Sequence, residues 1–361
     1  MTQHSGLASW LQLTLTPGLG AAAIRGLLKQ FGLPENILSA SRSQLERAGG
    51  PAAAQLLRAE GVAPEVERAL RWAEEPGRAI VTLADAGYPK LLLEIPDPPP
   101  LLYAVGRLEL LERPALAVVG SRNATVQGAR NAEQFAQAFS AAGLTIVSGL
   151  ALGIDAAAHR GGLAAAGSTI AVLGTGVDVI YPRQNAALAQ RIADSGLLLS
   201  EFALGTAGVA HHFPRRNRLI SGLAQGCLVI EAALASGSLI TARAAAEQGR
   251  EVFAVPGSIH SPLSKGCHAL IKQGAKLVES SEDVLAELTS FRRTGYASTR
   301  MAPATPDREP LLAHMAFDPV DVDSLCSRSG LPAEQVVAAL LRLELSGRVA
   351  ALPGGMYQRL D

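Results

Sequence analysis

Cysteine is scarce in this chain and forms no recognisable pattern. The sequence of 361 residues contains three cysteines, Cys227, Cys267 and Cys326, which lie far apart. They include no Cys-x-x-Cys pair and no spacing typical of a zinc site. We therefore expect reduced cysteines, as in a cytoplasmic protein, with no bound metal and no other cofactor.

Net charge and long apolar runs are also missing. Lys+Arg and Asp+Glu each number 32, so the formal net charge is +0. A neutral chain has no bulk attraction for polyanions, and any nucleic-acid binding must come from a local basic patch. The N-terminal segment has no leader pattern, and no uncharged apolar stretch reaches the about 18 residues of a membrane span. These absences predict a cytoplasmic protein without membrane contact.

Common enzyme motifs are absent as well. The chain has no Gly-x-x-x-x-Gly-Lys-Ser/Thr phosphate loop and no Gly-x-Ser-x-Gly nucleophile elbow. Asp155 and His159 share a helix face, but no third ligand stands at a recognisable spacing, so no metal site is expected. The sequence favours a protein that is not an enzyme.

The chain divides into three blocks and a linker. Residues 1–78 are rich in Ala and Leu and predict a helical domain, and residues 79–289 alternate short apolar runs with helical stretches. Residues 290–308 are polar and predict a linker, and residues 309–361 form a last small domain. The middle block predicts strands at 115–119, 144–147, 169–173, 197–200, 228–230 and 252–255. Helices are predicted at 128–142, 154–165 and 239–248, so the order predicts a doubly wound α/β sheet of Rossmann type.

Four of these predicted strands run into glycine at their carboxyl ends. The glycines are Gly120, Gly149, Gly174 and Gly257. Glycine permits a sharp turn, which is one explanation, and it permits the close approach of a ligand, which we favour. Because the carboxyl ends of parallel strands share one edge of the sheet, these loops predict a binding site there.

Polar residues follow these glycines and are the candidates for phosphate contacts. Ser121 and Arg122 precede a predicted helix, Ser238 opens another, and Lys265 lies on the rim. Arg183 follows Tyr181-Pro182 and is either a solvated surface charge or a phosphate ligand. Asp155 either caps its helix or orders a neighbouring arginine.

The densest signal is Phe213-Pro214-Arg215-Arg216-Asn217-Arg218. Arginine binds phosphate with a planar fork, and an aromatic ring can stack on an unpaired base. The segment therefore predicts single-stranded DNA binding by Phe213, Arg215, Arg216, Asn217 and Arg218. The alternative is a charged helix start with Phe213 in the core.

The middle block resembles the DNA-processing protein A family (DprA, also called Smf). The matching residues are Gly120-Ser121-Arg122, Ser148-Gly149, Gly153-Ile154-Asp155 with His159, Gly174-Thr175-Gly176, Tyr181-Pro182, Phe213-Pro214, Arg216-Asn217-Arg218, Ser236-Gly237-Ser238, Val255-Pro256-Gly257-Ser258, Gly266-Cys267, Leu270-Ile271 and Gly274-Ala275. The resemblance implies an extended Rossmann fold, binding of incoming single-stranded DNA in natural transformation, and loading of the recombinase RecA. Some members carry Lys where this chain has Ala210, which removes one positive charge.

The same resemblance implies a homodimer and two flanking domains. The dimer contact would involve His268, Leu270, Ile271, Leu277 and Val278. The segment from Leu13 to Gly20 resembles a helix-hairpin-helix or SAM-like element. Residues 309–358 resemble a winged helix with helices at 320–329 and 332–346, a turn at Gly330 and a hairpin at Gly354-Gly355. Its second helix is not basic, which favours contact with a partner over reading of DNA.

Two other functions stay open. Nucleotide or nucleoside phosphoribohydrolases share this fold class, but their Pro-Gly-Gly-x-Gly-Thr-x-x-Glu motif is absent here. Such an enzyme would depend on Asp155 or Glu231. A protein–protein adaptor is the third hypothesis, because the net charge is zero.

Overall fold

The computed structural model describes residues 2–48, 62–288 and 310–360. Within them, the middle of the chain forms one sheet with the strand order β1-β2-β6-β5-β4-β3-β7-β8-β9. Strands β3 to β9 pair in parallel, whereas β1 pairs with β2, and β2 with β6, in antiparallel fashion. The strands are β1 (Arg78–Thr82), β2 (Leu101–Gly106), β3 (Ala115–Val119), β4 (Thr145–Ser148), β5 (Thr169–Val172), β6 (Leu197–Ser200), β7 (Gly226–Val229), β8 (Glu251–Ala254) and β9 (Lys276–Leu277).

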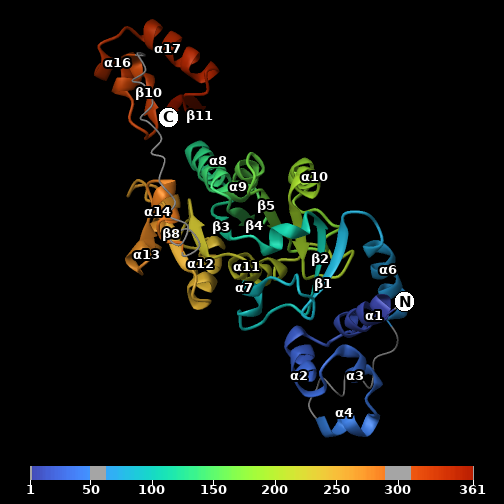
Figure 1. Ribbon diagram of the computed structural model, residues 1–361. Coiled ribbons are helices and arrows are strands. Elements are labelled where there is room, and N and C mark those ends of the chain that lie inside the picture. Colours follow the sequence, from blue (N-terminus) through green and yellow to red (C-terminus); the bar gives the residue numbers. More distant parts are fainter. Residues whose placement is uncertain (1, 49–61, 289–309, 361) are drawn as a thin grey trace.

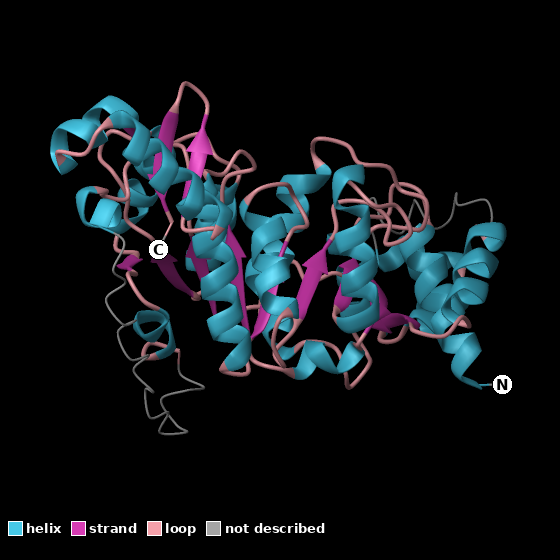
Figure 2. Ribbon diagram, turned by 90° about the horizontal axis from the view of Figure 1, so that it is seen from above, coloured by secondary structure: helices cyan, strands magenta, loops and turns pink. Residues whose placement is uncertain are grey.

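Helices cover both faces of this sheet, as Figures 1 and 2 show. Along β3, alternate residues point into two different apolar clusters: Ala117 packs on the side of α11 and α12, and Val118 on the side of α8 and α9. The doubly wound α/β prediction is therefore confirmed. The helices are α7 (Lys90–Leu93), α8 (Val126–Ala141), α9 (Ile154–Leu163), α10 (Ala186–Ser195), α11 (His212–Gly222), α12 (Ser238–Glu247), α13 (Lys265–Lys272) and α14 (Ser281–Leu285), with 3₁₀ turns η1 (Leu108–Glu112), η2 (Arg183–Asn185) and η3 (Pro262–Ser264).

The strand order reverses beside β3. The chain proceeds from β3 through β4 and β5 to β6 on one side, and β7, β8 and β9 lie on the other side of β3. At such a reversal the loops leaving neighbouring strands diverge and leave a crevice at the carboxyl ends. The fold thus places a crevice between the loops that follow β3 and β7.

The predicted strands are all present, with bounds that differ by at most two residues. Helix α8 starts two residues before the prediction because Thr125 caps it: the Thr125 hydroxyl oxygen accepts the Gly128 N–H at 2.9 Å. The antiparallel strands β1 and β2 were missed. Strand β2 follows Pro98-Pro99-Pro100, a run that reads as a loop and hides the start of the strand.

The N-terminal helices share a core with the sheet. They are α1 (Thr2–Leu15), α2 (Ala21–Phe31), α3 (Pro34–Ser39), α4 (Arg42–Ala48) and α6 (Ala63–Ala73). Trp10 of α1 and Trp72 of α6 are buried in one apolar cluster with Tyr103 of β2, and the Trp72 ring meets the Tyr103 ring edge-on at 5.8 Å. Helices α1 and α6 therefore extend the apolar layer over the antiparallel end of the sheet.

The C-terminal domain is a winged helix with its own core. It consists of η4 (Pro310–His314), β10 (Val320–Asp321), α16 (Val322–Ser329), α17 (Ala333–Leu345), β11 (Val349–Leu352) and β12 (Met356–Arg359). Helix α16 begins two residues later than predicted because the Asp321 carboxylate caps it by accepting the Ser324 N–H at 2.8 Å. Gly330 ends α16 with a φ of 69°, as the predicted turn requires.

The predicted linker at 290–308 lies outside the described residues. Among the helices that are described, none combines the length and apolarity needed to cross a bilayer.

Candidate functional site

A cavity of about 490 Å³ occupies the crevice beside β3. Three segments form its walls: the turn after β3, the first turns of α11, and the start of α12. The lining includes six of the predicted DNA-binding residues, namely Ser121, Arg122, Phe213, Arg216, Asn217 and Ser238. The fold therefore brings together residues that are up to 117 positions apart in the sequence, from Ser121 to Ser238.

The start of α12 is suited to binding an anion. Its N-cap residue, Gly237, has no side chain, and the first turn carries no acidic residue. The first N–H groups donate locally, Ser238 to the Ser236 hydroxyl at 3.3 Å and Leu239 to the Ser236 carbonyl at 3.1 Å, so this helix start acts on an anion through its partial positive charge. A Cβ at Gly237 would meet no atom within 4 Å, so the space beside it is open. The first N–H groups of a helix lack partners within the helix and carry partial positive charge, which attracts a phosphate.

Arg122 provides a positive charge at the same cavity. Its side chain is exposed and forms an ion pair with no carboxylate among the described residues. Its guanidinium carbon lies 5.7 Å from the centre of the Phe213 ring, a cation–π contact. Arg122 is therefore available to a phosphate and is held in place by an aromatic face.

Phe213 belongs to a small aromatic group at the rim. The ring packs so closely on Gly174 that a Cβ there would lie 2.7 Å from the ring. The centre of the Tyr181 ring lies 5.4 Å from that of Phe213, and Tyr181 is 51% exposed. Phe213 is thus half-buried. It is neither a fully buried core residue nor a fully open stacking surface, the two alternatives that the sequence left open. Tyr181 was missed as a candidate, although an aromatic residue after a glycine-ended strand is a usable signal.

Arg216 does not reach outward as predicted. It is 4% exposed, and its Nη1 donates to the carbonyl oxygens of Gly149, at 2.8 Å, and Val172. Burial lowers its pKa to about 10, an effect that the nearby Asp155 carboxylate opposes. Arg216 satisfies two strand-end carbonyls, so we correct its assignment from a DNA contact to a support of the cavity wall.

Asp155 orders the loop after β4. One carboxylate oxygen, Oδ2, accepts the N–H groups of Gly149 at 3.1 Å and Ala151 at 3.4 Å. Burial raises the pKa of Asp155, while the Arg216 guanidinium acts in the opposite direction. These contacts fix the backbone of the loop, and Arg216 acts on Asp155 through its nearby charge.

His159 is buried behind the same loop. Its Nε2 accepts the Leu150 N–H at 3.2 Å, and its Nδ1 lies 2.7 Å from the Thr169 hydroxyl. Burial, with a smaller contribution from Arg216, lowers the pKa of His159 to about 3. The imidazole is therefore neutral and fixes the loop backbone.

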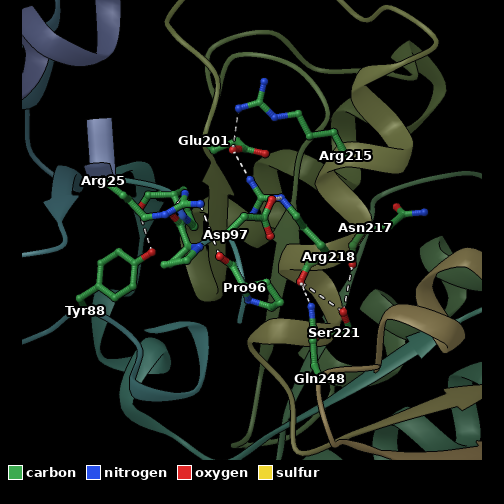
Figure 3. A network of polar contacts seen from close by, with 12 residues as sticks. Arg25, Tyr88, Pro96, Asp97, Glu201, Arg215, Asn217, Arg218, Ser221 and Gln248 are labelled. Carbon is green, nitrogen blue, oxygen red and sulfur yellow. Dashed lines mark hydrogen bonds and ion pairs between the residues drawn. The ribbon is translucent and has the colours of Figure 1, made fainter. Parts of the chain in front are cut away.

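Arg218 is also engaged within the protein. Figure 3 shows its guanidinium between two carboxylates, Glu201 at 2.6 Å and Asp97 at 2.8 Å, and the side chain is 13% exposed. Two carboxylates pair with this mostly covered side chain, and its Nη1 is shielded from solvent, so little of the guanidinium is open to a phosphate. Arg215 shares Glu201 at 3.1 Å but is 50% exposed. We therefore correct the assignment of Arg218 from a DNA contact to an ion-paired residue within the protein. Arg215 is the more accessible of the two arginines.

The other residues predicted to contact DNA differ in how exposed their side chains are. Arg183 and Lys265 are exposed, follow β5 and β8 respectively, and form no ion pair within the described residues. Ser121 is buried, and its hydroxyl oxygen accepts the Asn123 N–H at 3.1 Å. Ser121 therefore shapes the turn after β3.

The four loop glycines serve the protein's own packing. A Cβ at Gly120, Gly149, Gly174 or Gly257 would lie 2.2 to 2.7 Å from another side chain. At Gly149 that side chain is Arg216 and at Gly174 it is Phe213. This corrects the expectation that a ligand occupies the space beside these glycines, although Gly120 still lines the cavity.

Two residues predicted for a dimer contact are buried within the protomer. Leu270 and Val278 belong to the apolar clusters on opposite faces of the sheet, which corrects their assignment. Ile271 packs partly against the same core, and His268 binds the Gly257 carbonyl oxygen at 3.0 Å. Leu277 is 47% exposed on β9, the edge strand.

The second helix of the winged domain exposes apolar residues. Val337, Leu341 and Leu345 recur every four positions on α17 and are 47%, 56% and 82% exposed. Such a surface offers no charge to a phosphate backbone. That this helix serves a partner contact or packing in preference to DNA readout stays a prediction.

The hydrolase hypothesis depends on a free carboxylate, and the structure engages both candidates. Glu231 accepts the Thr125 N–H at 2.9 Å and the Thr125 hydroxyl at 2.6 Å, at the start of α8. Asp155 is held by backbone N–H groups as described above. Both carboxylates thus accept hydrogen bonds from groups of the protein itself.

Comparison with known proteins assigns the chain to a family. Residues 79–289 match the model of DNA recombination-mediator protein A, and residues 297–355 match that of the DprA winged helix domain. Protein Smf of Escherichia coli is 45% identical over 304 residues, which cover 82% of this chain and 81% of that protein. Solved structures give the same result. The crystal structure of DNA processing protein A from Streptococcus pneumoniae matches this chain with a TM-score of 0.67 at 42% identity, and the match covers 76% of this chain and 95% of that protein's chain. A structure of DNA processing protein A from Helicobacter pylori, solved for its single-stranded DNA binding mode, has a TM-score of 0.53 at 30% identity over 60% of this chain and 96% of its own. The chain belongs to the DNA recombination-mediator protein A family.

Proposed function

We propose that this protein binds single-stranded DNA in the cavity beside β3. The observation that carries the proposal is the pairing, in one cavity, of the start of α12, which bears no acidic residue, with the exposed and carboxylate-free Arg122. A helix start and an arginine fork together favour a phosphate. The single-stranded DNA binding mode of the Helicobacter pylori relative supports this choice of ligand.

The proposed mode of binding follows from the positions of these groups. A backbone phosphate lies between Arg122 and the first turn of α12, and Asn217 on α11 offers an amide group at the same cavity. An unpaired base stacks on the exposed Tyr181 ring, which Phe213 supports from below. Stacking of this kind needs bases that are free of a duplex, which favours single strands.

We further propose that the protein acts without catalysis, in DNA processing during natural transformation. Family membership supports this role, and the engaged states of Asp155 and Glu231 support the absence of a hydrolytic step. Loading of RecA and formation of a homodimer are proposals that rest on the family resemblance. Of the residues named for the dimer contact, Leu277 is the exposed candidate.

The test is a fluorescence anisotropy titration of labelled oligo(dT) and of a blunt duplex of equal length. We expect tight binding of oligo(dT) with little sequence preference, and clearly weaker binding of the duplex. Equal or tighter binding of the duplex contradicts the single-strand proposal. Release of base or phosphate from nucleotides would instead support the hydrolase.

A further inference from the structure

A second cavity, of about 450 Å³, lies on the other side of the start of α11. One wall is the turn between α1 and α2, from Thr16 to Gly20, with Ala21 at the start of α2. The opposite wall comprises Glu201 and Phe202, which follow β6, and Arg215 of α11. The cavity thus separates the N-terminal helices from the edge of the sheet that carries the first cavity.

The α2 wall has the chemistry of an anion site. Helix α2 is 11 residues long, its N-cap residue Gly20 provides no side-chain cap, and its first turn contains no acidic residue. Small residues surround this start, since Gly18, Gly20 and Ala21 all line the cavity. The first N–H groups of α2 are therefore accessible to a group as large as a phosphate.

Glu201 gives an independent indication of a ligand. Its side chain is 2% exposed, and Oε2 accepts from Arg215 at 3.1 Å and from Arg218 at 2.6 Å (Figure 3). The other oxygen, Oε1, is buried and has no hydrogen-bond partner in the described part of the chain. A buried acceptor without a partner is costly, so it indicates a hydrogen-bond donor that the protein itself does not supply.

The geometry of α11 relates the two cavities. Phe213 and Asn217 are four residues apart, lie on one face of the helix, and line the first cavity. Arg215 lies two residues from each, on the opposite face, and lines the second cavity. A strand that leaves the first cavity over the start of α11 therefore meets Arg215 next.

We propose that the second cavity binds a further nucleotide of the same DNA strand. Its phosphate lies between the first turn of α2 and the half-exposed Arg215, and a base N–H donates to Oε1 of Glu201. A nucleotide supplies both the anion and the donor that the two walls require. This inference rests on the proposed binding of single-stranded DNA in the first cavity.

The test places a charge at the start of α2 without harming the helix. Ala21→Asp introduces a carboxylate that favours the helix N-terminus and repels a phosphate, and Ala21→Asn is the matched neutral control. Binding is measured by anisotropy with oligo(dT) of about 6 nucleotides, a length for one cavity, and of about 20 nucleotides, enough for both. Thermal unfolding confirms that both variants are folded.

We expect Ala21→Asp to weaken binding of the longer strand by about five-fold or more, with Ala21→Asn close to wild type and the shorter strand unaffected by either change. Equal affinities of the two variants for the longer strand overturn the second site. An equal loss on both lengths overturns it too, because the effect is then not local. Arg122→Ala serves as the reference. If this variant binds both lengths of oligo(dT) as tightly as wild type, the proposed binding in the first cavity is wrong, and not only the second site.

Discussion

At the scale of single residues, arginine side chains that are neighbours in sequence have different roles. In α11, Arg216 is buried against strand-end carbonyls, Arg218 lies between two carboxylates, and Arg215 is half-exposed. All three stand within four positions, and the sequence predicts a DNA contact for each, with only Arg216 and Arg218 among the residues that match the family. Which arginine side chain is open to DNA depends on the helix face from which it projects. It also depends on carboxylates from other segments of the chain, such as Asp97 and Glu201.

Arg216 is predicted to matter for stability more than for direct contact with DNA. Removing a buried charge leaves Asp155 without its counter-charge and two carbonyls without a donor. We expect Arg216→Ala to lower the free energy of unfolding by about 3–5 kcal/mol in urea denaturation. A variant of wild-type stability that has lost DNA binding would contradict the structural role.

Tyr181 is predicted to contribute to binding without contributing to stability. Because half of its surface is exposed, replacement leaves the core intact. We expect Tyr181→Ala to weaken oligo(dT) binding by about 1–2 kcal/mol, and Tyr181→Phe to keep most of the affinity. Anisotropy and thermal unfolding of both variants check this, and a large drop in melting temperature with unchanged affinity would refute it.

The lowered pKa of the buried His159 predicts that the protein loses stability in acid. Its pKa is about 3 in the folded protein, against an ordinary value of 6.5, so the unfolded chain binds the proton first. Its contribution is complete above pH 6.5 and declines as the pH falls toward 3, by up to about 1.4 kcal/mol per pH unit. His159→Gln, which can still accept the Leu150 N–H, should show a shallower decline of the unfolding free energy. An unchanged acid slope would exclude His159 as its source.

At the scale of elements, the parallel strands were predictable because each is a short apolar run between helical stretches. The antiparallel strands β1 and β2 were not, because their pairing depends on contacts with β6, about a hundred residues away. The order of strands, and with it the cavity beside β3, also lies outside what apolar periodicity can reveal. The glycine-ended loops indicated the edge of the sheet that carries this cavity, although the glycines themselves are required by packing.

The start of α12 gives a prediction at this scale. Gly237 has a φ of −62° and open space around it, so other residues fit there. Gly237→Asp should stabilise the helix start and repel a phosphate, and Gly237→Asn should do only the former. We expect oligo(dT) binding about ten-fold weaker for Asp than for Asn, measured by anisotropy. Equal affinities of the two variants would place the phosphate elsewhere.

At the scale of the whole molecule, a protein with no net charge still presents several exposed cations at the edge of the sheet that carries the first cavity. Four exposed cations belong to this edge: Arg122, Arg183, Arg215 and Lys265. If all four contact phosphates, the logarithm of the binding constant should fall with the logarithm of salt concentration with a slope of about −3. The binding of a polyanion by this chain thus depends on where its charges lie, and the net charge of +0 is no obstacle.

The most direct test of the account is the affinity of Arg122→Ala for labelled oligo(dT), measured against Arg191→Ala. Arg191 is equally an exposed arginine, but it lies late in α10, whose end lies toward the opposite edge of the sheet. A charge-assisted phosphate contact contributes about 1.5–3 kcal/mol, so Arg122→Ala should bind about 10- to 100-fold more weakly, with Arg191→Ala and both melting temperatures close to wild type. Equal affinities of the two variants would contradict the cavity beside β3 as the binding site.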